Sequence, residues 1–99
     1  MRRVKMYAIY DRVAMMLAGW PFKGNNEAEA QRTFLALLTQ EDSLLSKNPE
    51  DFILMEIGEL DQIDGRLYGY DITKQIRSGT DMKRIMNGEE IEESEVNDA

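Results

Sequence analysis

The stretch FILMEIGELDQIDGRLYGY, residues 52–70, decides the fold that we predict. Its first half is apolar at successive positions, which is typical of a central strand with both faces buried, so residues 52–60 are predicted to form one. Asp64-Gly65 is a strong hairpin signal because both residues tolerate positive φ. Residues 67–70 are then predicted to return as the partner strand, which makes the sheet antiparallel.

The segment before this hairpin supplies more strands. Residues 4–10, VKMYAIY, combine β-branched, aromatic and apolar side chains and predict a strand. Residues 13–17 are compatible with a second strand that pairs back on the first. Pro21 and the pair Gly24-Asn25 then indicate a loop.

One long helix is predicted from Asn25 or Asn26 to Gln40. The Asn26 side chain can cap the free backbone N–H groups, and Glu29, three residues on, completes a capping-box pattern. Apolar residues then recur at helical spacing on one stripe, namely Ala30, Phe34, Leu37 and Leu38. Residues 43–46 add a short helical turn, which Asn48-Pro49 ends.

The remaining elements complete an α+β domain, a small antiparallel sheet of about four strands packed on one main helix in the order strand-strand-helix-strand-strand. Ile72 and Ile76 lie four residues apart and predict a short helix that Gly79 ends. Residues 81–86 are ambiguous. We therefore expect a single domain over residues 1–80 and a partly helical or disordered acidic tail over residues 81–99.

The charge of the chain is unevenly placed. The net charge is −7, but residues 88–99, GEEIEESEVNDA, hold six carboxylates and no base. Residues 1–87 carry the other 13 acids and all 12 bases, a net charge of −1. The tail cannot bury enough apolar surface to order itself, and it either keeps the protein soluble, competes with a polyanion or recruits a partner. The charge therefore does not exclude a nucleic-acid ligand.

Several function classes lack the residues that they need. The chain has no cysteine and no histidine, which removes thiol and imidazole catalysis and metal ligation. No nucleotide-binding glycine motif or nucleophile elbow is present, and no apolar run reaches the roughly 20 residues that span a bilayer. We expect no enzyme, no cofactor, no metal and no membrane contact. A weaker alternative is a cation or acid–base site at Glu56, Glu59, Asp61 and Asp64, where turn chemistry is the favoured interpretation.

Single-strand binding has better material, because it needs cations along the phosphates and aromatic faces for the bases. Aromatic and basic residues lie close together in the sequence, and the candidates are Arg2, Arg3, Lys5, Tyr7, Tyr10, Arg12, Trp20, Lys23, Arg66, Tyr68 and Tyr70. If the first and last strands lie close together, Tyr7 or Tyr10 shares a face with Tyr68 or Tyr70. The alternative is that these tyrosines are half-buried sheet residues with a hydrated hydroxyl.

Several segments also resemble a known family. They are MYAIYD (6–11), Pro21-Phe22, RTF (32–34) and residues 42–67, which contain DS (42–43), PEDF (49–52) and IGELD (57–61). In order and spacing they resemble the small nonstructural protein of gokushovirus-type microviruses, which are single-stranded DNA phages. The resemblance covers residues 5 to 80. It implies an accessory protein of genome replication or single-stranded DNA synthesis, and it supplies no catalytic residues.

These observations lead to two hypotheses. In the first, the chain acts in the host bacterial cytoplasm during viral genome replication, by binding single-stranded DNA or the viral replication proteins. In the second, it binds a host or viral protein without nucleic-acid contact, through a sheet edge or a surface rich in its seven methionines. Under either, we expect a homodimer, because about 80 ordered residues give a marginal core and exposed sheet edges invite pairing.

Overall fold

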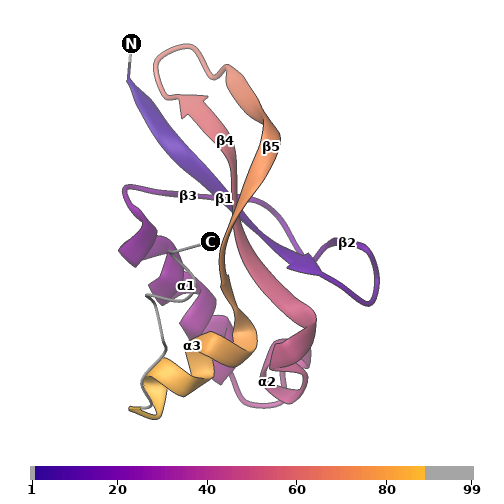
Figure 1. Cartoon of the computed structure of the whole chain (residues 1–99). Helices are drawn as coiled ribbons and strands as arrows, with labels where there is room; N and C mark the ends of the chain where they lie inside the picture. Colours follow the sequence, from indigo (N-terminus) through magenta and orange to yellow (C-terminus); the bar gives the residue numbers. More distant parts are fainter. Residues whose placement is uncertain (1, 89–99) are drawn as a thin grey trace, which may run out of the picture.

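The protein has the predicted α+β architecture. The computed structural model describes residues 2–88. Three helices gather at one end of the antiparallel sheet, and the turn between the last two strands extends beyond them at the other end (Figure 1). The elements are β1 (Arg3–Asp11), β2 (Met16–Leu17), β3 (Phe22–Gly24), α1 (Glu27–Thr39), α2 (Leu44–Lys47), the 3₁₀ turn η1 (Pro49–Asp51), β4 (Phe52–Asp61), β5 (Leu67–Ser78) and α3 (Gly79–Met86).

Strand β1 is the centre of the sheet. It pairs along its whole length with β4, which pairs in turn with β5, and its other edge pairs with β3 and then β2. The predicted hairpin between β4 and β5 is confirmed. The Asp61 N–H donates to the Arg66 carbonyl at 2.8 Å, and Gly65 has a φ of +79°, which a glycine adopts without strain.

Helix α1 begins as the sequence predicts. The Asn26 side chain accepts a 2.9 Å hydrogen bond from the Glu29 N–H, which satisfies one of the free donors of the first turn. The stripe on this helix is buried at Ala30, Phe34 and Leu38, each with no exposed surface. The helix therefore presents one apolar line to the sheet, as its spacing requires.

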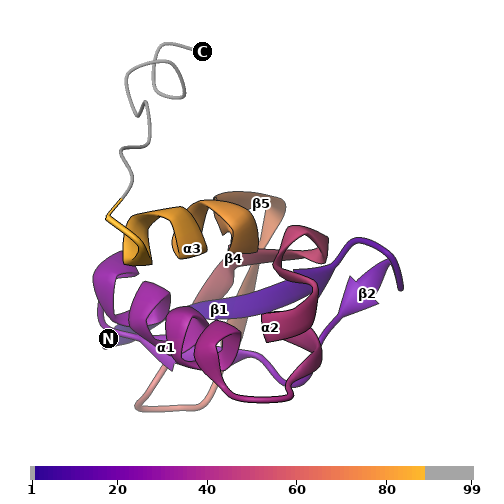
Figure 2. The ribbon, with the colours of Figure 1, turned by 90° about the horizontal axis from the view of Figure 1, so that it is seen from below.

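The alternation of side chains along β1 decides which side of the sheet the apolar stripe of α1 covers. Tyr7 and Ile9 belong to the same core as Phe34, together with Phe52 and Leu54 of β4 and Met82 of α3. Val4, Met6, Ala8 and Tyr10 must project to the other side, because successive side chains of a strand point to opposite faces. Seen from below, α1 and α3 lie together against the same side of the sheet (Figure 2). We call this side the helix side, and the side of Met6 and Ala8 the helix-free face.

Two expectations about the strands near the amino terminus need correction. The strand expected over residues 13–17 is only Met16–Leu17, because the Asp11 carboxylate accepts the N–H groups of Val13 and Ala14 and holds a turn there. The loop expected around Pro21 and Gly24 contains β3, so the sheet has five strands where about four were expected.

The short helix predicted around Ile72 and Ile76 is wrong. Strand β5 runs through both residues to Ser78, and the helix begins at Gly79, where we expected one to end. The Ser78 hydroxyl caps α3 by accepting from the Asp81 N–H at 3.1 Å. Gly79 is required there because a Cβ would collide with the Pro49 carbonyl oxygen.

Helix α3 is part of the packed core. Met82 is 4% exposed and contacts the cluster formed by α1 and the strands. The core thus includes Met82 of α3, while Ile85 and Met86 nearer the end of the helix are exposed; the division between domain and tail at residue 80 stays a prediction. The acidic residues from 89 onward lie outside the described residues.

We expect Phe34→Ala to lower the free energy of unfolding by about 3–5 kcal/mol, because it leaves a cavity at the contact between α1 and the sheet. Ile72→Ala is the control: its side chain is 87% exposed, so the change should stay within about 0.5 kcal/mol. Urea denaturation followed by circular dichroism measures both. Equal losses for the two variants would contradict the placement of the core.

Candidate nucleic-acid interface

The residues predicted to bind nucleic acid divide between the two sides of the sheet. Arg3 and Lys5 lie on the same side as Tyr7, because residues two and four positions apart along β1 point to the same face of the sheet. Tyr68 lies opposite Glu59, which lies opposite Lys5, so it is on the same side. Tyr10 and Lys23 lie on the other side of the sheet. Tyr10 is four positions from Met6 on β1 and so shares its face, and Lys23 is the cross-strand partner of Met6. The sequence placed these residues in one set, and the fold separates them.

On the helix side the cations already face carboxylates. The Arg3 guanidinium lies 3.9 Å from the centre of the Tyr68 ring, and its Nη1 is 3.3 Å from Glu59 Oε1. The Lys5 Nζ is 3.6 Å from Glu56 Oε1. In the hairpin turn, Arg66 Nε is 4.0 Å from Asp64 Oδ2. A phosphate would have to displace or approach a carboxylate at each of these positions.

Glu56 organises this side. Glu56 is 4% exposed, and its Oε2 accepts a 2.6 Å hydrogen bond from the Tyr70 hydroxyl. This hydrogen bond, with burial as the second cause, raises the pKa of Tyr70 well above the ordinary tyrosine value. Nearby, Lys74 Nζ donates to Glu27 Oε1 at 2.6 Å and ties β5 to α1, which raises the pKa of Lys74. Tyr70 therefore has a structural partner on the helix side.

Tyr7 must be removed from the candidate interface. It has no exposed surface, and its ring packs 6.1 Å from that of Phe22, so it cannot stack on a base. Burial raises the pKa of its phenol, with the charge of Glu56 as a second cause. Tyr7 does share the helix side with Tyr68 and Tyr70, as expected, but Tyr7 is buried in the core whereas Tyr68 and Tyr70 are partly exposed.

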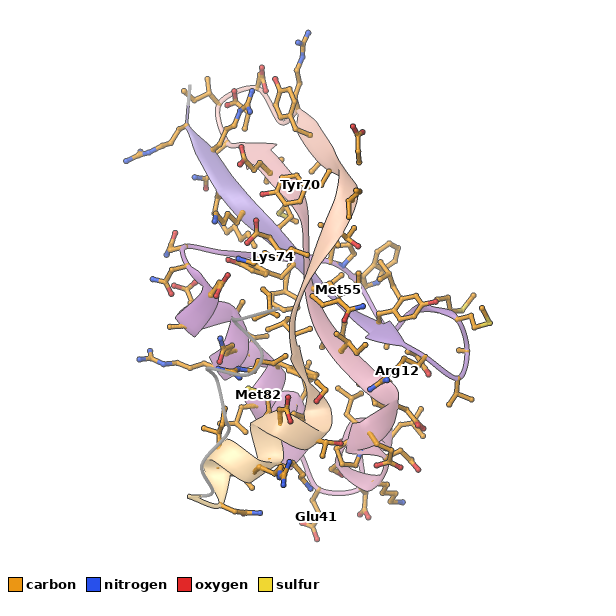
Figure 3. All side chains as sticks on the ribbon, viewed as in Figure 1. Arg12, Glu41, Met55, Tyr70, Lys74 and Met82 are labelled. Carbon is orange, nitrogen blue, oxygen red and sulfur yellow. The ribbon has the colours of Figure 1, made fainter. Side chains whose placement is uncertain are left out.

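The helix-free face has a different composition. Its positions on β1 and their partners on β4 carry no carboxylate in the described structure; they are Val4, Met6, Ala8 and Tyr10, opposite Leu60, Gly58, Met55 and Ile53. Figure 3 shows Met55 and Arg12 on the opposite side of the sheet from Lys74. Lys23, beside Met6, is exposed. This side therefore joins apolar and aromatic surface to cations at its border, and on β5 it also carries the exposed Asp71, the neighbour of Tyr70.

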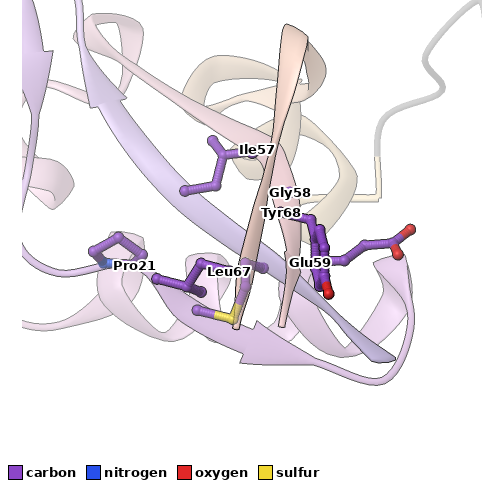
Figure 4. Close-up of a pocket in the computed structure, with 8 residues that line it drawn as sticks. Pro21, Ile57, Gly58, Glu59, Leu67 and Tyr68 are labelled. Carbon is purple, nitrogen blue, oxygen red and sulfur yellow. The ribbon is translucent and has the colours of Figure 1, made fainter. Parts of the chain in front are cut away.

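Two hollows mark the ends of this face. A pocket of about 210 Å³ is lined by Met6, Pro21, Ile57, Leu67 and the glycines Gly58 and Gly69, with Glu59 and Tyr68 at its margin. In Figure 4, Glu59 and Tyr68 project away from the side of the strands on which Pro21, Ile57 and Leu67 lie. A second hollow of about 240 Å³ contains Arg12, Arg77, Gln75 and Ile53, and Asp81 also borders it.

The other predicted residues lie in loops or at the ends of elements. Trp20, between β2 and β3, is 91% exposed, and it immediately precedes Pro21 of the pocket. Arg2 is exposed ahead of β1, and its carbonyl accepts from the Gln62 N–H. Sequence reasoning missed Arg77 and the apolar residues of the helix-free face. The alternation of Val4, Met6 and Ala8 was the signal that could have found the latter.

Two acidic residues near the hairpin, Asp61 and Asp64, accept hydrogen bonds from backbone N–H groups of the turn. Asp61 is 4% exposed and accepts from the Ile63 N–H at 2.9 Å, and Asp64 accepts from the Arg66 N–H at the same distance. Among residues 2–88, no group of three or more acidic side chains is placed to hold a metal ion. Within the same range, no helix has the length and apolarity to cross a membrane.

Comparison with known proteins identifies a family. A family described as Phage ORF5 protein matches residues 4–82, which covers the strands and helices described above up to α3. No curated protein and no solved structure matches the chain significantly.

Tyr70→Phe should lower the free energy of unfolding at neutral pH by about 1–3 kcal/mol, because it removes the donor to a buried carboxylate. The raised pKa of Tyr70 adds a pH dependence: its stabilisation is complete below the ordinary tyrosine value of 10.0 and is lost as the pH rises through the folded-state pKa. Urea denaturation across this range measures both effects. Tyr68→Phe, on the same strand and side, is the control. If the variant lost stability above pH 10 as steeply as the wild type, the contact would be contradicted.

Proposed function

The chain belongs to the phage ORF5 protein family, and we propose that it is a non-catalytic phage protein that binds single-stranded DNA through its helix-free face during genome replication. One observation carries this proposal. The helix-free face combines apolar and aromatic positions with the cations Arg12 and Lys23, and its positions on β1 and β4 hold no carboxylate within the described residues.

Single-strand binding requires two kinds of contact, and this face offers both. Bases lose their hydration favourably when they stack on aromatic or apolar surface, which Tyr10 and the exposed Trp20 provide. Phosphates follow cations, and this face has two along β1: Lys23 lies opposite Met6, near the middle of the strand, and Arg12 follows the end of the strand. A DNA strand that runs along the second half of β1 would meet Lys23 and then Arg12, with Tyr10 between them.

The helix side is the weaker alternative for DNA. Arg3 and Lys5 are already paired with Glu59 and Glu56, so a phosphate there would gain attraction to the cations and repulsion from the carboxylates. We therefore assign Arg3, Lys5, Tyr68 and Tyr70 to the structure of the sheet. The expected role in the host cytoplasm is retained in the proposal, since a phage genome is copied there.

A second candidate function is supported by the apolar side chains at the border of the same face. Leu17, opposite Tyr10, is 39% exposed and Leu67, opposite Leu60, is 70% exposed, and exposed apolar side chains gathered on one face mark an interaction surface. A second copy or a viral replication protein that covers this face would bury them. Light scattering separates DNA binding from coverage of this face by a second copy. If a homodimer persists when DNA is bound, the two copies contact each other elsewhere, for example at the outer edge of β5.

We expect a fluorescent single-stranded oligonucleotide to bind with an affinity that falls as salt rises, because each phosphate contact releases a counterion. Removing one phosphate contact, in Arg12→Gln or Lys23→Gln, should make the negative slope of log affinity against log salt less steep by about 0.7. Lys47→Gln, which removes the same charge from α2, should leave the slope unchanged. An absence of binding at low salt would overturn the proposed function.

The single tryptophan of the chain reports on the same contact. Trp20 is 91% exposed, so stacking of a base on its ring should quench its emission. Trp20→Ala should weaken binding by about fivefold to 150-fold, which corresponds to about 1–3 kcal/mol for one stacked base. Quenching titrations in the wild type and anisotropy in the variant measure this. Emission that stays constant while the oligonucleotide binds would exclude Trp20 from the interface.

A further inference from the structure

Gly69 in β5 has no explanation in the fold. Its φ lies outside the left-handed region, and a Cβ built at this position meets no atom within 4 Å. The strand could therefore accept a side chain here, and a glycine in a strand interior weakens the strand. The facing residue differs: a Cβ at Gly58 would collide with the Tyr68 carbonyl oxygen, so that glycine is required by packing.

The two glycines together create the pocket on the helix-free face. Gly58 and Gly69 are cross-strand partners, so the absence of both side chains leaves the backbone of β4 and β5 bare at this point. Met6, Pro21, Ile57 and Leu67 line the resulting open pocket of about 210 Å³. Figure 4 shows Pro21, Ile57 and Leu67 on one side of the strands. Bare backbone in a strand commonly marks a place where a ligand approaches closely.

The surroundings of the pocket indicate the class of ligand. Its walls are apolar, which suits the flat faces of a planar group, and the exposed Lys23 lies beside Met6, where it can meet an anion. The Glu59 carboxylate points away to the other side of the sheet (Figure 4). In the described chain β5 is the last strand on its side, so alternate N–H and C=O groups along its outer edge face outward and can bond a polar rim.

We propose that this pocket holds one nucleobase of the bound single strand, with Lys23 on an adjacent phosphate. This inference rests on the proposed function and adds a specific subsite to it. A nucleobase matches the pocket because it is a planar group with a polar rim that is attached to an anionic backbone. Gly69 is then a glycine because a side chain would occupy the volume that the base takes.

The test fills the pocket without disturbing the strand. Gly69→Val introduces a side chain that strands favour, at a position with free space, so the variant should fold with unchanged or higher stability. Thr73→Val places the same side chain at an exposed position of the same strand and is the matched control. Anisotropy is measured with an oligothymidylate of about 12 nucleotides and with an abasic oligonucleotide of the same length.

We expect Gly69→Val to bind the oligothymidylate about tenfold more weakly and the abasic strand as the wild type does, because only a base contact is lost. Thr73→Val should match the wild type with both probes. Unchanged binding of the oligothymidylate by Gly69→Val would overturn the subsite while the proposed function stands, whereas a wild type that binds neither probe overturns the proposed function. A change of oligomeric mass in Gly69→Val would assign the pocket to a second copy and overturn the subsite.

Discussion

The structure depends on the contact between the buried stripe of α1 and alternate residues of β1. Phe34 and Leu38 bury themselves against Tyr7 and Ile9, and Phe52 and Leu54 of β4 complete the same core. Since strand side chains alternate, fixing Tyr7 and Ile9 toward the helix fixes Val4, Met6, Ala8 and Tyr10 on the other side. The helices of the described chain that contribute to the core, α1 and α3, pack on the opposite side from these four residues. The helix-free face is thus a direct consequence of which residues α1 covers.

Local signals in the sequence predicted much of this fold. Asp64-Gly65 and Asn26 act through their own backbone preferences, and both appear in the structure as the turn and the helix cap. The error at Ile72 and Ile76 has a simple origin, because a spacing of four residues fits a strand as well as a helix. Strand β3, only three residues long, was beyond a pattern-based prediction since it is defined by its pairing with β1.

The candidate interface was harder to predict because residue type does not give the side of a sheet. Lys5 and Lys23 are both cations near apolar residues, yet Lys5 faces Glu56 on the helix side and Lys23 lies beside Met6 on the other. Ile57 is an extra residue in β4, where the register with β1 shifts between Met6 and Tyr7. Such a bulge cannot be read from composition, and it brings Glu56 opposite Tyr7. The resemblance to a phage protein family is the part of the functional prediction that the family match confirms.

Methionine methyl groups test most directly whether the helix-free face is the binding surface. Met6 and Met55 are partly exposed on that face, whereas Met82 is buried in the core on the helix side. In a carbon-13 NMR titration of methionine-labelled protein with single-stranded DNA, we expect the methyl signals of Met6 and Met55 to move and that of Met82 to stay. Movement at Met82 alone, or at none of the three while DNA binds, would contradict the account.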